Sequence, residues 1–276
     1  MYVVMDELSG IGKSYRNKLS RVLENNYSVI TAKLVSKTLK VSVQESGRLL
    51  SRWNKSGWIK RIKRGSYIPI PLESTTSKVV VEEPFLVTDS LYGPGYIAGF
   101  SAVKHWDLSE QIIESVTYFT LKQVKNRNPI HGGIKFKLKT ISKHKLFGLK
   151  TLWIGSKKIR ISGPAKTMID LLDDPKIVGG ITIITDFLSE YIDSDHYDLD
   201  LLIQYAHQMN NRTIFKRLGL IYEMMFDANE EVLSLFLKNI SSGFSEFDPT
   251  VSSSHNIIKW KLKTSEFWKM KYDRKE

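Results

Sequence analysis

The sequence predicts an α+β protein, with a helical first quarter followed by a larger part of mixed strands and helices. Apolar residues recur at helical spacing through residues 11–57, and residues 59–70 then alternate apolar and basic side chains, as in a pair of strands. Beyond residue 84, β-branched runs come first and helix-spaced segments follow, which favours α+β over a doubly wound sheet. We therefore divide the chain of 276 residues into a first domain, a linker and a second domain, at 1–72, 73–84 and 85–276.

The first quarter is predicted to hold three helices. The stretch "IGKSYRNKLSRVLENN" (11–26) has apolar residues at helical spacing, and Thr31 is a suitable N-cap for a second helix in "ITAKLVSKTLK". A third helix is expected after Ser42, because Ser42 and Glu45 fit a capping box, in which each side chain satisfies a free amide donor. Gly57 is a natural stop for this helix.

The third predicted helix has an apolar face and a cationic face. Val43, Leu50 and Trp53 are expected to point inward. The opposite face carries residues at spacings of four, four and three, namely Gln44, Arg48, Arg52 and Lys55. Two short helices with such a face on the second are typical of a helix-turn-helix motif, whose second helix enters the major groove of DNA. There Arg binds guanine and Gln binds adenine, so the first three residues are expected to read base edges and Lys55 to hold the backbone.

A β-hairpin is predicted directly after this helix, in "WIKRIKRGSYIPI" (58–70). Ile59–Ile62 and Tyr67–Ile70 are its strands, and Gly65 supplies the positive φ that the turn requires. The hairpin corresponds to the wing of a winged helix-turn-helix domain, which contacts phosphates or a minor groove. The wing residues expected at DNA are Lys60, Arg61, Lys63, Arg64 and Tyr67. The alternative is that this basic surface is simply solvated.

The charge distribution supports a polyanionic partner. The net charge is +12, and residues 31–68 hold ten basic residues against one acid. Residues 115–169 hold thirteen basic residues and no acid, whereas acids are frequent in residues 186–200. A field of this sign attracts nucleic acid first and acidic lipid second. We expect double-stranded DNA as the partner of the first basic zone.

Composition excludes several other classes. The sequence has no Cys, so disulfides, thiolate nucleophiles and Cys-ligated metal sites are excluded. No apolar run approaches the ~18 residues of a membrane helix, and the start "MYVVMDELSG" lacks the pattern of a signal peptide. We therefore expect a cytoplasmic protein without a membrane partner. The six His residues show no short ligand spacing, so we expect no metal site and no cofactor.

The second domain is predicted to begin with strands and continue with helices. The strands are expected at Phe85–Thr88, Val116–Thr120, Ile134–Thr140, Thr151–Ile154 and Ile159–Ile161. The helices are expected at Ser101–Asp107, Ala165–Leu172, Ile181–Ile192, Leu199–Met209, Thr213–Phe226 and Glu230–Ile240. Residues 241–256 have the composition of a loop. The segment after them mixes basic and aromatic residues and is expected to pack back through four apolar residues, Trp260, Leu262, Phe267 and Trp268. The alternative is a further nucleic-acid contact.

The segment "KFKLKTISKHK" (135–145) predicts a strand with one cationic face. The lysines alternate with Phe136 and Leu138 and then continue beyond the strand, at Lys135, Lys137, Lys139, Lys143 and Lys145. Two interpretations stay open. One is a charged edge strand that resists aggregation, and the other is a second polyanion surface that extends the DNA footprint or meets RNA.

Three segments resemble AbiEi-type antitoxins, the regulator half of type IV abortive-infection toxin–antitoxin pairs. "GYIAGFSAVKHWDLSEQI" (95–112) and "IRISGPAKTMIDLLDDPKIVGGI" (159–181) are similar to two core segments of that family. "GWIKRIKRGSYIPIP" (57–71) is similar to the wing of its N-terminal domain, and the family's Arg-Gly-x-Tyr pattern occurs at 64–67. The resemblance covers residues 30–225 approximately, and the recognition-helix residues above rest on helical spacing rather than on it.

The resemblance implies a winged-helix DNA-binding domain followed by an α+β antitoxin domain. Members of this family are transcriptional repressors that bind operator repeats upstream of their own operon, and they take part in abortive infection, a form of phage defence. They counter a nucleotidyltransferase-type toxin encoded next door, often without forming a stable complex with it. We therefore predict a non-enzymatic, DNA-binding antitoxin of a toxin–antitoxin system.

Two other classes remain as alternatives. One is an enzyme, and the carboxylates of a Mg²⁺-dependent nuclease would be Asp170, Asp173, Asp174, Asp186 and Glu190. A nucleotide-hydrolysing loop at Gly10–Ser14 fits less well, because Glu7 stands where the phosphate-binding pattern requires Gly. The other class is a winged-helix regulator whose second domain senses a ligand.

Overall fold

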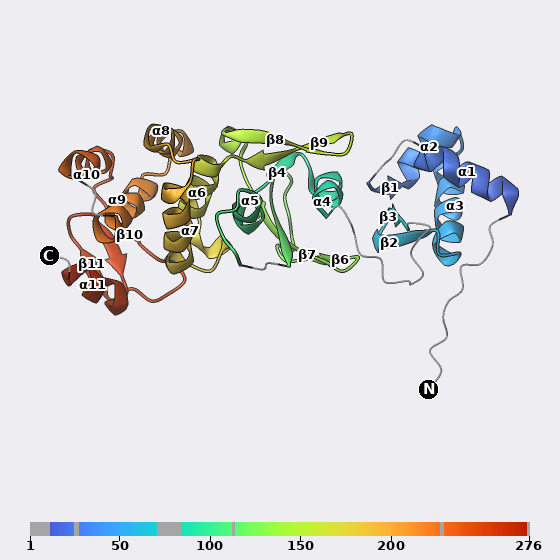
Figure 1. Ribbon diagram of the computed structural model, residues 1–276. Helices are drawn as coiled ribbons and strands as arrows, with labels where there is room; N and C mark the ends of the chain where they lie inside the picture. The colour runs from blue at the N-terminus through green and yellow to red at the C-terminus, as the bar shows by residue number, and fades with distance from the viewer. Residues whose placement is uncertain (1–11, 25–27, 71–83, 112–113, 227–228, 275–276) are drawn as a thin grey trace.

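The computed structural model describes residues 12–24, 28–70, 84–111, 114–226 and 229–274. These residues form an α+β protein with eleven α-helices and three sheets. Figure 1 shows how these elements are arranged. We call residues 12–70 the N-terminal unit and residues 84–274 the larger unit. The linker expected at 73–84 lies, except for Pro84, outside the described residues.

The N-terminal unit contains the three expected helices and the expected hairpin. The helices are α1 (Lys13–Leu23), α2 (Ala32–Leu39) and α3 (Val43–Lys55), and the hairpin strands are β2 (Ile59–Lys63) and β3 (Ser66–Pro69). A two-residue strand that the sequence did not predict, β1 (Ile30–Thr31), pairs with β3 to complete a small antiparallel sheet in the order β1-β3-β2.

Local hydrogen bonds explain where these helices begin and end. Thr31 Oγ1 accepts a hydrogen bond from the backbone N–H of Leu34 at 3.4 Å, and Ser42 Oγ accepts one from Glu45 N–H at 3.1 Å. Both predicted N-caps are therefore confirmed. The reciprocal half of the predicted capping box is not formed among the described residues, because the Glu45 carboxylate lies 3.7 Å from Lys18 Nζ of α1 instead. Gly57 follows α3 with a φ of +75°, in the left-handed region that a side chain would strain, which confirms it as the stop.

One inward position of α3 was predicted wrongly. Val43 is 60% exposed, because it is the first helical residue and lies before the turn that meets the core. The buried residues of α3 are Ser46, Leu49, Leu50 and Trp53, which pack with α1, α2 and β2 in a core of the N-terminal unit.

A six-stranded mixed sheet is the centre of the larger unit. Its strands are β4 (Gly95–Ile97), β5 (Ser115–Thr120), β6 (Ile130–His131), β7 (Ile134–Thr140), β8 (Leu149–Ile154) and β9 (Lys157–Ser162), in the order β6-β7-β5-β4-β9-β8. The β4–β9 and β5–β7 pairs are parallel, and the others are antiparallel. Four of the five predicted strands are confirmed.

The fifth prediction, a strand at Phe85–Thr88, is wrong. These residues belong to helix α4 (Pro84–Tyr92), whose Leu86 and Val87 pack on the sheet together with Ile97 and Ile161. A short apolar run fits either a buried strand or a buried helix, and here the helix wins because it covers one face of the sheet.

The other face of the sheet is covered by helices. All six predicted helices are confirmed with small shifts at their ends, and their bounds are α5 (Gly99–His105), α6 (Pro164–Asp173), α7 (Ile181–Asp193), α8 (Leu199–Met209), α9 (Thr213–Met225) and α10 (Glu230–Leu237). Figure 1 shows α6 and α7 between the sheet and the C-terminal elements. Tyr96 and Phe119 of the sheet share one core with these helices.

The C-terminal segment is more ordered than the sequence predicted. It forms a third sheet from β10 (Ser245–Glu246), β11 (His255–Ile257) and β12 (Leu262–Thr264), followed by α11 (Glu266–Asp273). The expected packing is confirmed for three of the four residues, since Trp260, Leu262 and Trp268 are buried, but Phe267 is 62% exposed. Arg217 of α9 holds the segment by donating hydrogen bonds to the backbone oxygens of Glu246 (2.7 Å) and Phe247 (2.9 Å).

The two units touch through an apolar cluster. Val29, Ile62 and Ile68 of the N-terminal unit are buried in the same cluster as Leu86 and Val87 of α4. A hydrogen bond of 2.8 Å from Lys157 Nζ to Ser28 Oγ adds a polar contact beside it. The hairpin of the N-terminal unit is therefore packed against the larger unit on one side.

Candidate nucleic-acid interface

The outward face of α3 has the composition that the sequence predicted. Gln44, Arg48, Arg52 and Lys55 are all exposed, and the buried residues of the helix lie on the opposite side. Gly47 and Ser51 lie on the same face and are also exposed, although they were not among the residues predicted to contact DNA. We call these six residues the α3 face. Within the described ranges, Gln44, Arg48 and Lys55 have no hydrogen-bond or ion-pair partner, so their polar groups are available to another molecule.

Arg52 is the one cation of this face that a neighbouring helix positions. Its guanidinium carbon lies 4.4 Å from the ring centroid of Tyr15 in α1. A cation stacked on an aromatic ring keeps its outer N–H groups available while losing rotamer freedom. Tyr15 also packs against the core of the N-terminal unit. The sequence alone contained no signal for its contact with Arg52, because the contact depends on how α1 packs beside α3.

Gly47 lies in the middle of α3, where glycine costs roughly 0.5–1 kcal/mol relative to alanine. A Cβ atom at this position would meet nothing within 4 Å, so packing does not explain the residue. The absence of a side chain lets the helix backbone approach a partner closely, beside Arg48 and Ser51 on the same face. The glycine is therefore a second feature, besides charge, that suits this face to a groove.

The hairpin is tied to the end of α3. Asn54 Oδ1 accepts a hydrogen bond of 2.8 Å from the backbone N–H of Arg61, and the β2–β3 ladder shifts register between Arg61 and Lys63. Gly65 has the predicted positive φ, +75°, and forms a two-residue turn with Arg64 between Lys63 and Ser66. The side chain of Arg64 is therefore at the tip of the hairpin.

The basic residues of the hairpin differ in their surroundings. Arg61, Lys63 and Arg64 are exposed, whereas Lys60 is half-buried. Lys63 Nζ lies 5.3 Å from the ring centroid of Tyr92 in α4, so this ammonium group is turned toward the larger unit. Its charge, together with burial as the larger cause, lowers the pKa of His131.

Tyr67 also differs from the other hairpin residues predicted to contact DNA. Its ring is half-buried against the core of the N-terminal unit, opposite Ile30 of β1 and Arg61 of β2. The matched Arg-Gly-x-Tyr pattern is therefore split between an exposed tip at Arg64 and an aromatic ring that supports the sheet. We define the cationic surface of this unit as the α3 face together with Arg61 and Arg64.

The second predicted basic surface is mostly directed toward acids and carbonyls of the same chain. Lys135 forms an exposed ion pair with Glu114 at 2.5 Å, and Lys137 Nζ donates a hydrogen bond of 2.9 Å to the backbone oxygen of Ile177. Lys143, in the 3₁₀ helix at residues 143–145, is exposed. An isolated exposed lysine is ordinary protein surface.

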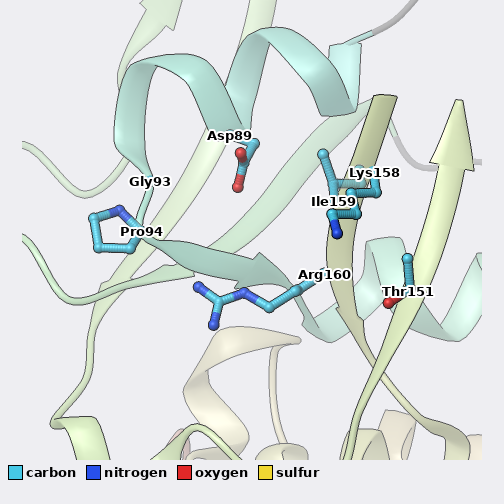
Figure 2. Close-up of a pocket in the computed structure, with 7 residues that line it drawn as sticks. All are labelled: Asp89, Gly93, Pro94, Thr151, Lys158, Ile159 and Arg160. Atoms are coloured by element: carbon cyan, nitrogen blue, oxygen red, sulfur yellow. The ribbon is translucent and has the colours of Figure 1, made fainter. Parts of the chain in front are cut away.

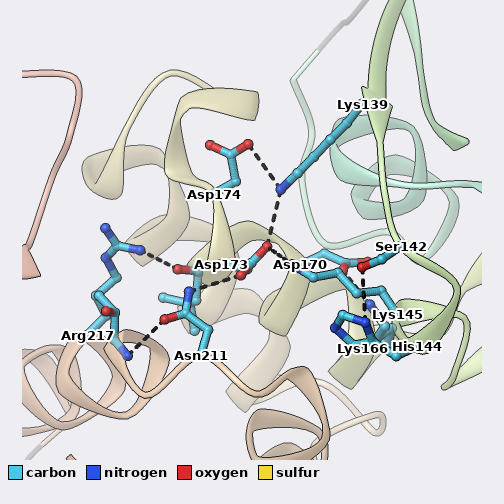
Figure 3. A network of polar contacts seen from close by, with 12 residues as sticks. Lys139, Ser142, His144, Lys145, Lys166, Asp170, Asp173, Asp174, Asn211 and Arg217 are labelled. Atoms are coloured by element: carbon cyan, nitrogen blue, oxygen red, sulfur yellow. Dashed lines mark hydrogen bonds and ion pairs between the residues drawn. The ribbon is translucent and has the colours of Figure 1, made fainter. Parts of the chain in front are cut away.

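The remaining two lysines of that surface converge on the end of α6, as Figure 3 shows. Asp173 Oδ2 accepts hydrogen bonds from Lys139 Nζ at 3.2 Å and from Lys145 Nζ at 2.7 Å. Lys139 Nζ also lies 3.1 Å from Asp174 Oδ2. Burial raises the pKa of Asp173, but these lysines and Asn211 outweigh it and hold the pKa at about 2. This part of the basic zone therefore joins β7 to α6.

The nearby Asp170 is enclosed with Lys166, four residues earlier on α6. The two side chains are 1% and 0% exposed and form an ion pair, and Tyr96 OH donates a hydrogen bond of 3.0 Å to Asp170 Oδ2. Burial raises the pKa of Asp170 and lowers that of Lys166. The group is sealed from solvent, so removing one charge alone would leave the other buried without its counter-ion.

These contacts bear on the nuclease alternative. Asp170 is sealed with its lysine, Asp173 and Asp174 face two other lysines, and Asp186 and Glu190 lie exposed on α7. No group of three His, Asp or Glu side chains among the described residues is arranged to hold a metal ion. For the nucleotide-hydrolysing alternative, Lys13 is the first residue of α1 and is exposed, while Glu7 and Gly10 lie outside the described residues.

Comparison with known proteins identifies a shared fold. No protein-family model and no curated protein matches this sequence. The crystal structure of the RV2827C protein from Mycobacterium tuberculosis matches with a TM-score of 0.57 at 13% sequence identity, over 99% of this chain and 98% of that chain. The architecture is therefore similar along nearly the whole length of both chains. Every helix in the described part of the chain is too short or too polar to cross a bilayer.

Proposed function

We propose that this protein is a winged helix-turn-helix repressor that binds double-stranded operator DNA, and that it is the antitoxin of a toxin–antitoxin operon. The observation that carries the DNA-binding part is the α3 face, where exposed Gln44, Arg48, Arg52 and Lys55 surround an exposed glycine. Such a helix fits the width of the major groove. The chain would act in the cytoplasm and would need no cofactor.

The two parts of the cationic surface have different roles in this proposal. Gln44, Arg48 and Arg52 read base edges, because their planar side chains can form paired hydrogen bonds with adenine or guanine. Lys55, Arg61 and Arg64 hold the phosphates on either side, and Lys60 and Lys63 add charge beside them. Tyr67 supports the hairpin from behind. Sequence specificity then comes from α3, and most of the salt-dependent affinity comes from the hairpin and Lys55.

The antitoxin part rests on the resemblance to AbiEi-type regulators, and one structural relationship supports it. The two core segments of that resemblance are adjacent in space, because β4 and β9 are parallel neighbours that pair at Ile97 and Ile161. Each segment then continues into a helix, α5 or α6. The protein would counter a nucleotidyltransferase-type toxin encoded beside it, with or without direct contact.

A gel-shift titration tests DNA binding. The wild-type protein is titrated into its own upstream DNA and into scrambled DNA of equal length at several salt concentrations. Each base-reading contact removed by Arg48→Ala and Arg52→Ala is expected to cost about 1–3 kcal/mol on the upstream DNA. Lys104→Ala removes an exposed cation on α5, far along the chain from this surface, and is expected to bind like wild type. Unchanged affinity in the double arginine variant would exclude the α3 face as the reading element.

A growth assay tests the antitoxin part separately. The neighbouring gene is expressed from an inducible promoter with and without this protein, and growth is followed. Restored growth with the wild-type protein supports the proposal. Restored growth with the double arginine variant would show that toxin neutralisation does not require DNA binding by the α3 face. Full toxicity in the presence of the wild-type protein, or no toxicity from the neighbouring gene, contradicts the antitoxin assignment and leaves the repressor assignment standing.

A further inference from the structure

A groove of about 480 Å³ opens between the end of α4 and the β8–β9 hairpin, as Figure 2 shows. Seven residues line it: Asp89, Gly93, Pro94, Thr151, Lys158, Ile159 and Arg160. Its volume is within the range of small-molecule sites, roughly 300–1,000 Å³. It belongs to the larger unit and shares no residue with the cationic surface of the N-terminal unit.

Arg160 is the feature of this groove that most needs a partner. The side chain is half-buried, and in Figure 2 it extends from β9 beneath Asp89 toward Pro94. Within the described part of the chain, its guanidinium has no hydrogen-bond or ion-pair partner. A guanidinium has five N–H donors in a planar fork that matches a phosphate or carboxylate. Lys158 of the same strand adds a second cation to the groove.

Asp89 supplies an acceptor on the opposite wall. Its Oδ1 accepts a hydrogen bond of 2.6 Å from the hydroxyl of Tyr118. Burial, with the neighbouring carboxylate as a smaller cause, raises the pKa of Tyr118, so this hydroxyl stays protonated and fixes the carboxylate. The other carboxylate oxygen is left to accept a hydroxyl or amine of a ligand.

An exposed aromatic ring lies on the strand opposite one of the groove's two cations. Trp153 of β8 is 64% exposed and is the cross-strand partner of Lys158, while Thr151, two residues earlier, is the partner of Arg160. Directly opposed residues project from the same face of an antiparallel pair, so the indole and both cations share one face of the hairpin. An indole next to cations that bind phosphate is the arrangement on which nucleic-acid bases stack.

We propose that this groove binds a nucleotide. The phosphate lies between Arg160 and Lys158, the base stacks on Trp153, and Asp89 accepts a hydrogen bond from a sugar hydroxyl or a base amine. Two cations and one carboxylate favour an anion that also carries donors, which a nucleotide provides. A free nucleotide and a single strand of nucleic acid both carry a base and a phosphate, so either could be the ligand.

Calorimetric titration of the full-length protein tests the proposal. The probes are the ribonucleoside 5′-monophosphates, inorganic phosphate and a short single-stranded oligonucleotide. At least one nucleotide is expected to bind about tenfold or more tightly than phosphate. Arg160→Gln is expected to weaken nucleotide binding by a similar factor, and Trp153→Ala is expected to remove the advantage over phosphate without affecting the fold, since the ring is mostly exposed.

The matched control is Lys150→Gln, which removes an exposed cation of β8 that does not line the groove. It is expected to bind like wild type, as is the double arginine variant of α3. Tighter binding of the oligonucleotide, with the same dependence on Trp153 and Arg160, supports the site and identifies a strand as its source. Equal affinity for phosphate and nucleotides, affinity unchanged by Arg160→Gln, or no binding at millimolar concentration overturns the proposal.

Discussion

Asn54, near the end of α3, accepts a hydrogen bond of 2.8 Å from the backbone N–H of Arg61 in β2. This bond joins the helix proposed to read DNA to the hairpin proposed to hold its backbone. It also satisfies an amide donor beside the register shift of the ladder, where regular pairing is interrupted. The angle between helix and hairpin is therefore set by one side chain in addition to the packing below it.

Asn54→Ala is expected to loosen this angle. The loss of one hydrogen bond should lower the free energy of unfolding by about 1 kcal/mol, because the amide of Arg61 can turn to water. Operator affinity should fall although no DNA-contacting group is removed. Urea denaturation and a gel shift measure the two effects. Asn54→Asp keeps the acceptor and is the control for the urea measurement alone, because its negative charge beside Arg61 would itself repel phosphates. An alanine variant with wild-type operator affinity contradicts the positioning role.

Gly47→Ala is expected to separate stability from DNA binding. No atom would obstruct the added methyl group, so the variant should be more stable by about 0.5–1 kcal/mol through better helix propensity. If the backbone of α3 approaches the groove closely at this point, operator affinity should decrease despite the higher stability. Thermal unfolding and a gel shift are the measurements. A variant that is more stable and binds DNA as before would show that Gly47 is remote from the DNA.

Removing one member of the Lys166–Asp170 pair is expected to lower the free energy of unfolding strongly, whereas replacing the whole polar group with apolar residues is expected to lower it little. Lys166→Met alone leaves Asp170 buried without its counter-ion, and the expected loss is about 3–5 kcal/mol of unfolding free energy. A triple variant with Lys166→Met, Asp170→Leu and Tyr96→Phe removes all three polar groups and should recover most of that loss. Chemical denaturation compares the two proteins. Equal destabilisation in both would mean that the site needs polar side chains for another reason.

Acid should weaken the contact between β7 and α6. The pKa of Asp173 is about 2 in the folded protein against an ordinary 3.8, so the carboxylate stabilises the fold above pH 4 approximately, and this contribution is lost as the pH falls toward 2. This difference in pKa corresponds to about 2 kcal/mol of unfolding free energy, since one pKa unit is about 1.4 kcal/mol. Denaturation at several pH values measures it. Asp173→Asn should be less stable at neutral pH and should show a shallower acid dependence than wild type.

Much of the local structure could be predicted because it depends on neighbouring residues. The caps at Thr31 and Ser42 and the turn at Gly65 each follow from backbone groups within a few positions. The cationic face of α3 follows from helical periodicity alone. The ambiguous case was Phe85–Thr88, where a run of three apolar residues before Thr88 is too short to show a period by which helix and strand can be distinguished.

The contacts that the sequence could not predict join residues far apart in the chain. Arg52 stacks on Tyr15, and Lys139 reaches Asp173, because of how helices and strands pack, which no spacing rule encodes. The groove also could not be predicted, because its lining residues are far apart in the chain. They come from the end of α4 and from both strands of a hairpin about sixty residues later. A count of charges therefore does not distinguish Lys139 from Arg160, although Lys139 is paired with Asp173 and the guanidinium of Arg160 has no hydrogen-bond or ion-pair partner among the described residues.

The close contact between Gly219 of α9 and Trp260 has a consequence for how the chain folds during synthesis. The indole of Trp260 fills the space that a side chain at Gly219 would occupy, so this face of α9 stays uncovered until residue 260 has been made. The core of the N-terminal unit, by contrast, is complete once Tyr67 and the rest of β3 have been made. During synthesis, the helices before Gly219 therefore leave apolar surface exposed until the C-terminal segment has been made, whereas the N-terminal unit can already be folded. The larger unit is the part of this protein that a chaperone would be expected to meet.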